Sequence, residues 1–224
     1  MFGKEKIMII NIILAIVAIF LSLITHEIAH GYIALQQGDN TAKMQQRLSL
    51  NPLKHIDIFG TILLPLLLFF SKIGFVFGWA KPVPINLSKL KTKKSLFLVS
   101  VAGITANAIL VVIFSILLKL IVLFPNSFLS GIIAMFCFQM IFINIILIIF
   151  NLLPIPPLDG SKIFLIWFDN YWIKKYLSLE NKGLYILIAF IFILPSILYI
   201  FDINFNPLVF LIKKITVWIM QLIV

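Results

Sequence analysis

Long apolar segments recur along this sequence and restrict the class of fold that it can adopt. One of them begins at Ile7 and continues to Thr25 without a charged residue. Of the 224 residues, 62% are hydrophobic, whereas only about half of a soluble domain is apolar. Inside a bilayer, only α-helices and closed barrels satisfy their own backbone polar groups. The sequence therefore predicts an all-α, multi-pass membrane protein.

The apolar segments also indicate how many times the chain crosses the membrane. A spanning helix needs about 20 apolar residues, so we expect about four to six transmembrane helices. Residues 207–224 are apolar but carry Lys213 and Lys214 near their middle, which favours a helix that lies on the membrane surface. The clearest spanning segments are residues 7–37, 95–124, 131–153 and 183–201.

Between the first two main spans, residues 38–94 are predicted to contain a small extended or re-entrant element. Residues 60–77 are apolar but interrupted by proline, glycine and lysine. Residues 79–87 read W-A-K-P-V-P-I-N-L, and their two prolines exclude a helix and favour an extended edge segment. The sequence leaves two roles open for this segment: the edge of a sheet, or a strand that pairs with an unwound substrate.

The net charge of +10 comes from basic residues in loops, and it predicts a membrane orientation rather than nucleic-acid binding. Residues 38–94 and the loop after Leu153 carry many lysines, whereas residues 124–130 and 202–206 carry no lysine or arginine. Basic loops stay on the cytoplasmic side of a membrane. We therefore expect a cell-membrane protein with its N-terminus outside, in which residues 60–77 enter and leave the membrane on the same side.

Three ionisable residues, His26, Glu27 and His30, read H-E-I-A-H inside the first apolar helix. Residues four positions apart lie on one face of a helix, so the two imidazoles can bind the same metal ion. Glu27 is placed beside them to accept a proton from a water molecule. Ionisable side chains cost about 3 kcal/mol or more each inside a bilayer, and those that persist usually have a function. The motif therefore predicts a membrane-embedded metalloprotease, a hydrolase of peptide bonds.

A catalytic zinc ion usually takes three protein ligands, so a third ligand is expected outside the motif. The candidates are His55, Glu180 and the aspartates, of which Asp159 is the strongest. Asp159 follows a span that ends in L-P-I-P-P-L-D-G, and broken backbone of this kind can carry a carboxylate into a helical bundle. Alternatively, Asp159 caps the helix that follows it. For His55, a place in a loop or an interface is the alternative to metal binding.

A different class of function is also compatible with paired histidines in a membrane: a metal-binding transporter or a catalytically inactive scaffold. A transport site needs ligands but has no use for a general base. Glu27, directly beside His26, therefore favours the enzyme.

Two motifs in this order give the chain a resemblance to the site-2 protease family of intramembrane zinc metalloproteases. The first is H-E-I-A-H, and the second is N-x-x-P-x-P-x-L-D-G at residues 151–160. F-G-W-A-K-P-V-P-I-N at residues 77–86 resembles a segment that the family carries between them. V-A-G-I-T-A-N at residues 101–107 resembles the family's A-G-P-x-x-N motif, with Ile104 where proline is usual.

The resemblance implies a role for each polar residue of the two motifs. His26, His30 and Asp159 would bind one zinc ion. Glu27 would activate water, and Asn151 would hold the substrate or the developing oxyanion. The implied partners are the lipid bilayer and a transmembrane substrate protein. Because His26 lies beyond the midpoint of the first helix, toward the end expected to face the cytoplasm, we expect the cut near the cytoplasmic side of the membrane.

The resemblance also implies a domain organisation. It covers residues 7–165, which would form the core, and residues 183–224 would add accessory helices. Residues 1–224 are then expected to be a single membrane-embedded domain, similar to the short family members that lack PDZ and CBS domains.

Overall fold

The computed structural model describes residues 3–70, 78–90, 92–124, 127–168, 171, 173, 175, 178, 180–203 and 205–223. Residues 71–77, the second half of the expected re-entrant segment, lie outside the described residues, as does the side chain of Glu180.

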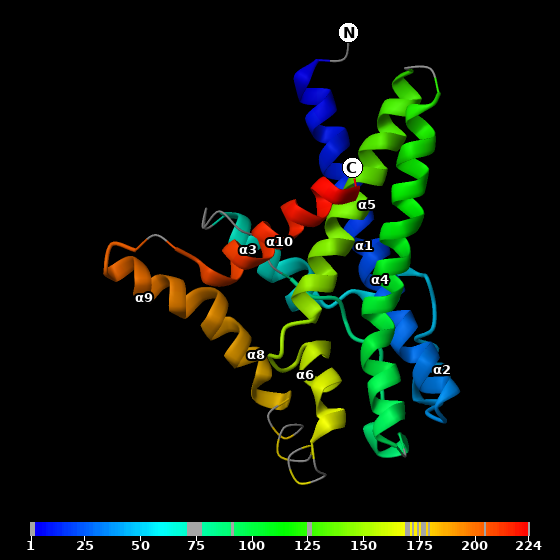
Figure 1. Cartoon of the computed structure of the whole chain (residues 1–224), viewed down its shortest axis with the longest axis vertical. Coiled ribbons are helices and arrows are strands. Elements are labelled where there is room, and N and C mark those ends of the chain that lie inside the picture. Colours follow the sequence, from blue (N-terminus) through cyan, green and yellow to red (C-terminus); the bar gives the residue numbers. More distant parts are fainter. Residues whose placement is uncertain are drawn as a thin grey trace.

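Three long helices form the main bundle, α1 (Lys4–Gln36), α4 (Lys93–Val122) and α5 (Phe128–Asn151). Each is long and apolar enough to cross a membrane, and shorter apolar helices cover residues 58–67 and 185–200. The prediction of an all-α membrane protein is therefore confirmed. Figure 1 shows that α1 and α5 run in the same direction and that α4 runs against them.

Local signals in the sequence set the ends of these helices. After α1, Gly38 has a φ of +97°, a left-handed conformation that glycine adopts without steric cost. Thr92 caps α4 by accepting a hydrogen bond from the backbone N–H of Ser95. Ser127 and Ser130 form a reciprocal capping box at the start of α5.

Small buried side chains allow the three helices to approach one another. Ala18 and Ala34 of α1 and Cys137 of α5 have no exposed surface. Because these side chains are small, the helix backbones can pack closely. In lipid the hydrophobic effect between helices is weak, so this close packing stabilises the bundle.

The chain between α1 and α4 leaves the bundle and returns to it. It contains α2 (Thr41–Met44), a 3-10 turn η1 (Pro52–His55), a π-helical turn η2 (Ile58–Leu63) that continues into α3 (Leu64–Phe70), and a 3-10 turn η3 (Leu87–Lys89). The backbone N–H of Trp79 donates to the carbonyl of Gly60 at 3.0 Å. The two ends of this excursion are therefore hydrogen-bonded together. That it enters and leaves the membrane on the same side stays a prediction.

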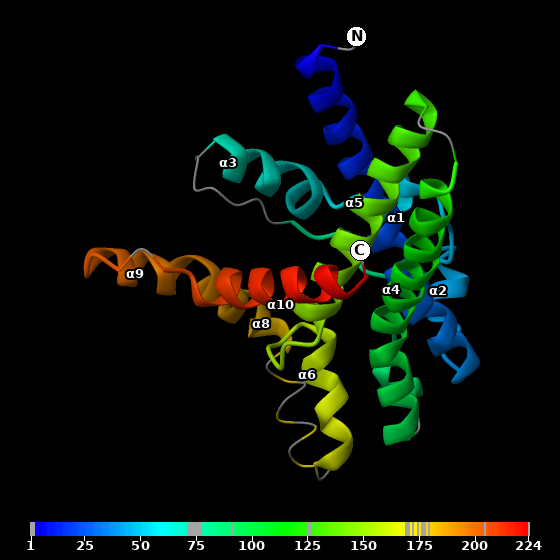
Figure 2. The same ribbon diagram turned by 45° about the horizontal axis from the view of Figure 1, so that its top comes forward.

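The C-terminal part extends to one side of the bundle (Figure 2). It contains α6 (Asp159–Ile163), a 3-10 turn η4 (Phe164–Trp167), α8 (Glu180–Ile188), a π-helical turn η5 (Ala189–Ile193), α9 (Leu194–Ile200) and α10 (Pro207–Ile223). The segment expected to span at residues 183–201 is thus α8, η5 and α9 in sequence.

The last helix crosses the bundle obliquely and packs on α5 (Figures 1 and 2). Met220 of α10 shares a buried apolar cluster with Val111, Ile141 and Ile145. With 17 residues, α10 is about 26 Å long, shorter than the roughly 30 Å hydrocarbon core. The expectation that this helix lies on the membrane surface stays a prediction.

Candidate metal centre

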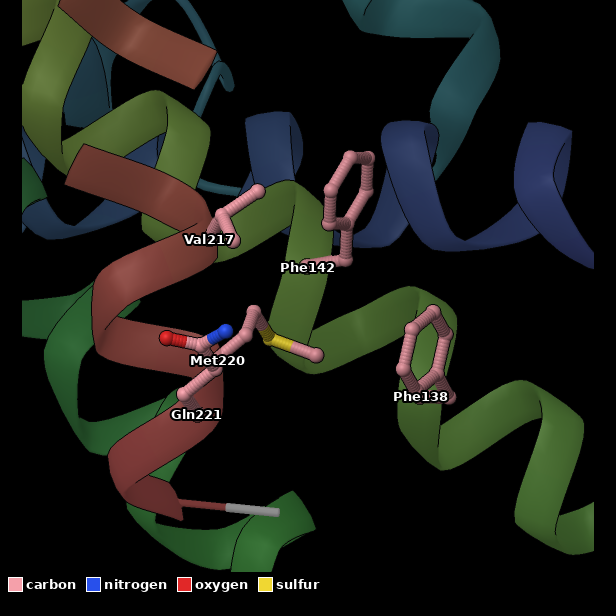
Figure 3. Close-up of a pocket in the computed structure, with 5 residues that line it drawn as sticks. All are labelled: Phe138, Phe142, Val217, Met220 and Gln221. Carbon is pink, nitrogen blue, oxygen red and sulfur yellow. The ribbon is translucent and has the colours of Figure 1, made fainter. Parts of the chain in front are cut away.

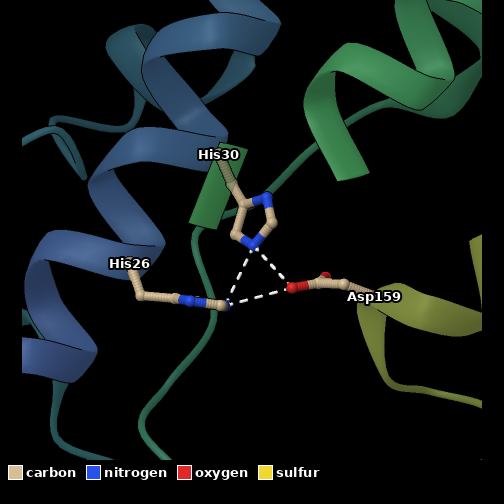
Figure 4. A group of neighbouring side chains, drawn as sticks. All are labelled: His26, His30 and Asp159. Carbon is tan, nitrogen blue, oxygen red and sulfur yellow. Dashed lines mark hydrogen bonds and ion pairs between the residues drawn. The ribbon is translucent and has the colours of Figure 1, made fainter. Parts of the chain in front are cut away.

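The two histidines of α1 and the aspartate that begins α6 converge on one point (Figure 4). Nε2 of His26 and Nε2 of His30 are 3.0 Å apart. Oδ2 of Asp159 lies 3.2 Å from the first and 3.1 Å from the second. Within the described part of the chain, these three residues are the group whose donor atoms could hold a metal ion. We call them the donor triangle.

The donor triangle fits a zinc ion. Donors around a tetrahedral ion with bonds of about 2.0–2.1 Å are about 3.3 Å apart, close to the observed spacing. Two imidazole nitrogens and one carboxylate oxygen form a typical catalytic zinc set, and a fourth position remains for water. His26 and His30 are only 5% and 7% exposed, so the donors are fixed within the protein.

The orientation of His30 is set by a backbone group of α4. Its Nδ1 lies 2.7 Å from the carbonyl oxygen of Val99. A carbonyl only accepts, so Nδ1 carries the proton and Nε2 faces Asp159 with a free lone pair. Val99 carries no signal in the sequence because the contact uses only its backbone.

Asp159 is directed toward the histidines by the broken end of α5. A Cβ on Gly160 would lie 2.3 Å from the carbonyl oxygen of Leu152, so only glycine allows this close turn after Asp159. Oδ2 of Asp159 faces both imidazoles, as a ligand requires.

Gly103 allows α4 to pack directly on the donor triangle. A Cβ at this position would lie 2.4 Å from Cε1 of His26 and 2.4 Å from Nε2 of His30. Gly103 belongs to the V-A-G-I-T-A-N stretch, and no role was predicted for it from the sequence. Its role depends on the packing of α4 against α1, which brings it next to both histidines.

Glu27 lies on a face of α1 next to the face that carries the two histidines, and it faces the extended segment 79–86. Its Oε2 accepts a hydrogen bond from the backbone N–H of Val83 at 2.8 Å. Gly31, one turn later, permits this approach, because a Cβ there would lie 2.7 Å from Cγ1 of Val83. The contact fixes one oxygen of Glu27 and leaves Oε1 available.

The backbone of the extended segment is largely occupied by contacts within the chain. The N–H of Lys81 donates to the carbonyl of His55 at 2.8 Å, and that of Asn86 donates to Asp39 at 2.6 Å. Arg47 donates to the carbonyls of Lys81 and Pro82. The segment contains no helix, as its prolines predicted, and it forms no ladder in the described residues. These contacts favour a role in anchoring and positioning Glu27 over an open edge for a substrate.

The structure places two other predicted residues outside the donor triangle. His55 is fully buried, and its Nε2 lies 2.8 Å from the carbonyl oxygen of Ser49. It ends the 3-10 turn η1 in the connection between α1 and α4, which agrees with the alternative to metal binding. Asn151 donates from Nδ2 to the carbonyl of Leu147 at 3.0 Å.

A pocket of about 350 Å³ is lined by residues of α5 and α10 and is distinct from this centre (Figure 3). Phe138, Phe142, Val217, Met220 and Gln221 line it. It shares no residue with the donor triangle, and its lining residues include no histidine, cysteine or carboxylate.

Known proteins that are similar to this chain agree with a zinc site at the donor triangle. The profile of the family described as "Peptidase family M50" matches residues 14–195. "Putative zinc metalloprotease YwhC" of Bacillus subtilis (strain 168) is 41% identical over 152 residues, which cover 66% of this chain and 66% of that protein. "Putative zinc metalloprotease Rip2" of Mycolicibacterium smegmatis is 34% identical over 153 residues, which cover 66% of this chain and 54% of that protein. The matches thus span less than the full length of either relative. No solved structure matches the chain.

Proposed function

The chain belongs to peptidase family M50, and on this premise we propose that it is a zinc-dependent endopeptidase that cleaves substrates within their transmembrane segments. The observation that carries the proposal is the donor triangle of His26, His30 and Asp159, formed by residues far apart in the sequence. Its place on an apolar helix supports cleavage at membrane depth.

Three side chains would hold the ion, and a fourth would move the proton. His26, His30 and Asp159 would bind zinc through Nε2, Nε2 and Oδ2. A bound zinc ion supplies a Lewis acid that polarises a carbonyl group and lowers the pKa of water. Glu27, with Oε2 held by Val83, would accept the water proton on Oε1 and pass it to the leaving amine.

Asn151 would assist by binding the substrate carbonyl. Its Nδ2 donates to the carbonyl of Leu147, one turn earlier in α5. To bind substrate, the amide would exchange this bond for one to the developing oxyanion. Asn151 therefore contributes to turnover rather than to zinc affinity.

The position of the centre along α1 supports the expected cutting site. α1 runs from Lys4 to Gln36, and His26 is about 9 Å beyond its midpoint, six residues at 1.5 Å each. Figure 1 places the donor-bearing end of α1 with α2, α6 and the start of α4, opposite the N-terminus. We propose that this end faces the cytoplasm, because the basic loops lie there. The cut would then fall nearer the cytoplasmic end of a substrate helix.

The test uses purified protein reconstituted with a model transmembrane substrate. The wild type should release a product whose cut, mapped by mass spectrometry, lies inside the substrate's apolar segment, and Glu27→Gln should not. Substrates weakened at that point by Gly or Pro should be cut faster than Leu-substituted ones, because poor helix formers unwind more easily. Cleavage only in a soluble loop, or rates indifferent to these residues, would contradict the intramembrane mechanism.

A further inference from the structure

Three polar side chains are buried within the bundle of α1, α4 and α5. Ser22 of α1, Asn107 of α4 and Asn144 of α5 each have no exposed surface. Asn144 donates to Oγ of Ser22 at 2.8 Å and so joins α5 to α1. Polar groups in such a setting cost free energy unless they find hydrogen-bond partners.

Helix geometry places Asn107 in the same layer. Residues four apart share a helix face, so Ser22 lies one turn before His26, and Asn107 lies one turn after Gly103. Gly103 faces His26 directly. α1 and α4 run in opposite directions (Figure 1). One turn back along α1, from His26 to Ser22, and one turn forward along α4, from Gly103 to Asn107, therefore lead toward the same end of the bundle. Asn107 therefore lies at the level of Ser22.

Several atoms of this layer have hydrogen-bonding capacity that no described residue satisfies. They are Oδ1 and Nδ2 of Asn107, Oδ1 of Asn144 and Nδ1 of His26. The last faces α4, since it would be 2.6 Å from a Cβ on Gly103. When Nε2 of His26 binds a metal, Nδ1 must be a donor, whereas the two asparagine oxygens are acceptors. A water molecule, which both donates and accepts, matches this set.

The two histidines differ in what orients them. His30 donates to the carbonyl of Val99. His26 has no such protein acceptor in the described part of the chain. Metal-bound histidines almost always donate their second N–H to a carboxylate, a carbonyl or a water molecule. The polar layer contains the groups that could hold that water.

We propose that Ser22, Asn107 and Asn144 form a binding site for one water molecule that accepts a hydrogen bond from Nδ1 of His26, and that Asn107 is thereby a positioning residue for the metal centre. The inference rests on the proposed function only for the identity of the metal. Asn107 touches no reacting atom and acts through His26.

The test compares zinc affinity with the stability of the metal-free protein. Asn107→Leu should raise the zinc dissociation constant, measured by chelator competition, by about 10- to 100-fold. The Tm of the metal-free variant should stay the same or rise, because a buried amide without partners is replaced by an apolar side chain. Asn107→Ser, which keeps a hydroxyl and leaves room for water, should bring the constant back to within about threefold of wild type.

The matched control is Asn11→Leu, which removes an amide of α1 that pairs with Gln139 at 2.9 Å outside the layer. It should leave zinc affinity unchanged. An unchanged zinc affinity in Asn107→Leu would overturn the inference, and so would a loss of affinity accompanied by a lower Tm of the metal-free protein. Asn107→Ala carries the same comparison if the leucine variant does not fold.

Neither measurement uses a substrate, so the two proposals fail separately. A wild-type protein that binds zinc but cuts no transmembrane segment contradicts the proposed function alone. An active protease in which Asn107→Leu binds zinc as tightly as wild type contradicts this inference alone.

Discussion

The carboxylate of Glu27 accepts a hydrogen bond from the backbone N–H of Val83 at 2.8 Å. This contact joins the proposed general base to the extended segment that follows the re-entrant element. The segment is held in turn by Asp39 and Arg47. The position of the base therefore depends on residues of the chain between α1 and α4.

Glu27→Gln should retain zinc and lose turnover by about 10²- to 10⁴-fold, the usual contribution of a general base. The glutamine carbonyl can still accept from Val83, so the fold should be unchanged. Metal content and cleavage of a model substrate, measured on one preparation, check this. Glu27→Ala should in addition lower the free energy of unfolding by about 1–3 kcal/mol, since the Val83 N–H loses its partner. A Glu27→Gln variant that cleaves at the wild-type rate would remove Glu27 from the mechanism.

Asp159→Ala should lose zinc and activity together, and His26→Ala and His30→Ala should behave alike. The comparison variant is His55→Ala, a buried histidine outside the donor triangle. It should keep one zinc per chain and lose about 1–3 kcal/mol of stability, because the carbonyl of Ser49 loses its donor. Zinc content by elemental analysis and thermal unfolding separate the two behaviours. Full zinc content in Asp159→Ala would mean that the third ligand is another residue.

Gly103→Ala should displace both histidines, because the new Cβ would lie 2.4 Å from each ring. We expect a loss of about 1–3 kcal/mol from overpacking, together with a large fall in zinc affinity. Gly131→Ala on α5 is the control, since no atom of the described residues lies within 4 Å of its Cβ position. It should leave zinc affinity unchanged. Equal zinc affinity in the two variants would show that α4 does not constrain the metal centre.

The anchor of the extended segment should depend on pH through Asp39. Burial raises the pKa of this carboxyl, but hydrogen bonds from Thr41 and Asn86 outweigh burial and hold the pKa below its ordinary value of 3.8. The folded pKa is thus lower than the unfolded one. The stabilisation is complete above the ordinary value and is lost as the pH falls through the folded pKa.

This predicts a pH-dependent difference between the wild type and Asp39→Asn, in which the side chain keeps its shape but not its charge. The Tm of the variant should be lower than that of the wild type near neutral pH. The gap should narrow as the pH falls below about 4. A gap that is constant from neutral to acidic pH would contradict the assigned role of the carboxylate.

The proposed orientation can be tested with single cysteines. Lys93→Cys, at the start of α4, should react with a membrane-impermeant thiol reagent from the cytoplasmic side, and Ser127→Cys, before α5, from the outside. Cys137 is fully buried and should not react. Labelling of both positions from the same side would contradict the crossing of the membrane by α4. Labelling of each position from the side opposite to the expected one would mean that the proposed orientation is reversed.

The sequence alone determined the features that depend on neighbouring residues. The apolar segments predicted the helices, and the spacing of His26 and His30 placed both imidazoles on one helix face. Proline and glycine located the broken end of α5. These inferences succeed because helix periodicity, capping and the cost of charge in lipid act over a few residues.

Only the tertiary structure decided which distant groups meet. It brought Asp159 to two histidines about 130 residues earlier, and it placed His55 in a loop instead. It also gave His30 an orienting carbonyl from Val99 and made Gly103 necessary. Such contacts depend on helix packing and on backbone groups that every residue carries, so no local pattern of side chains can specify them.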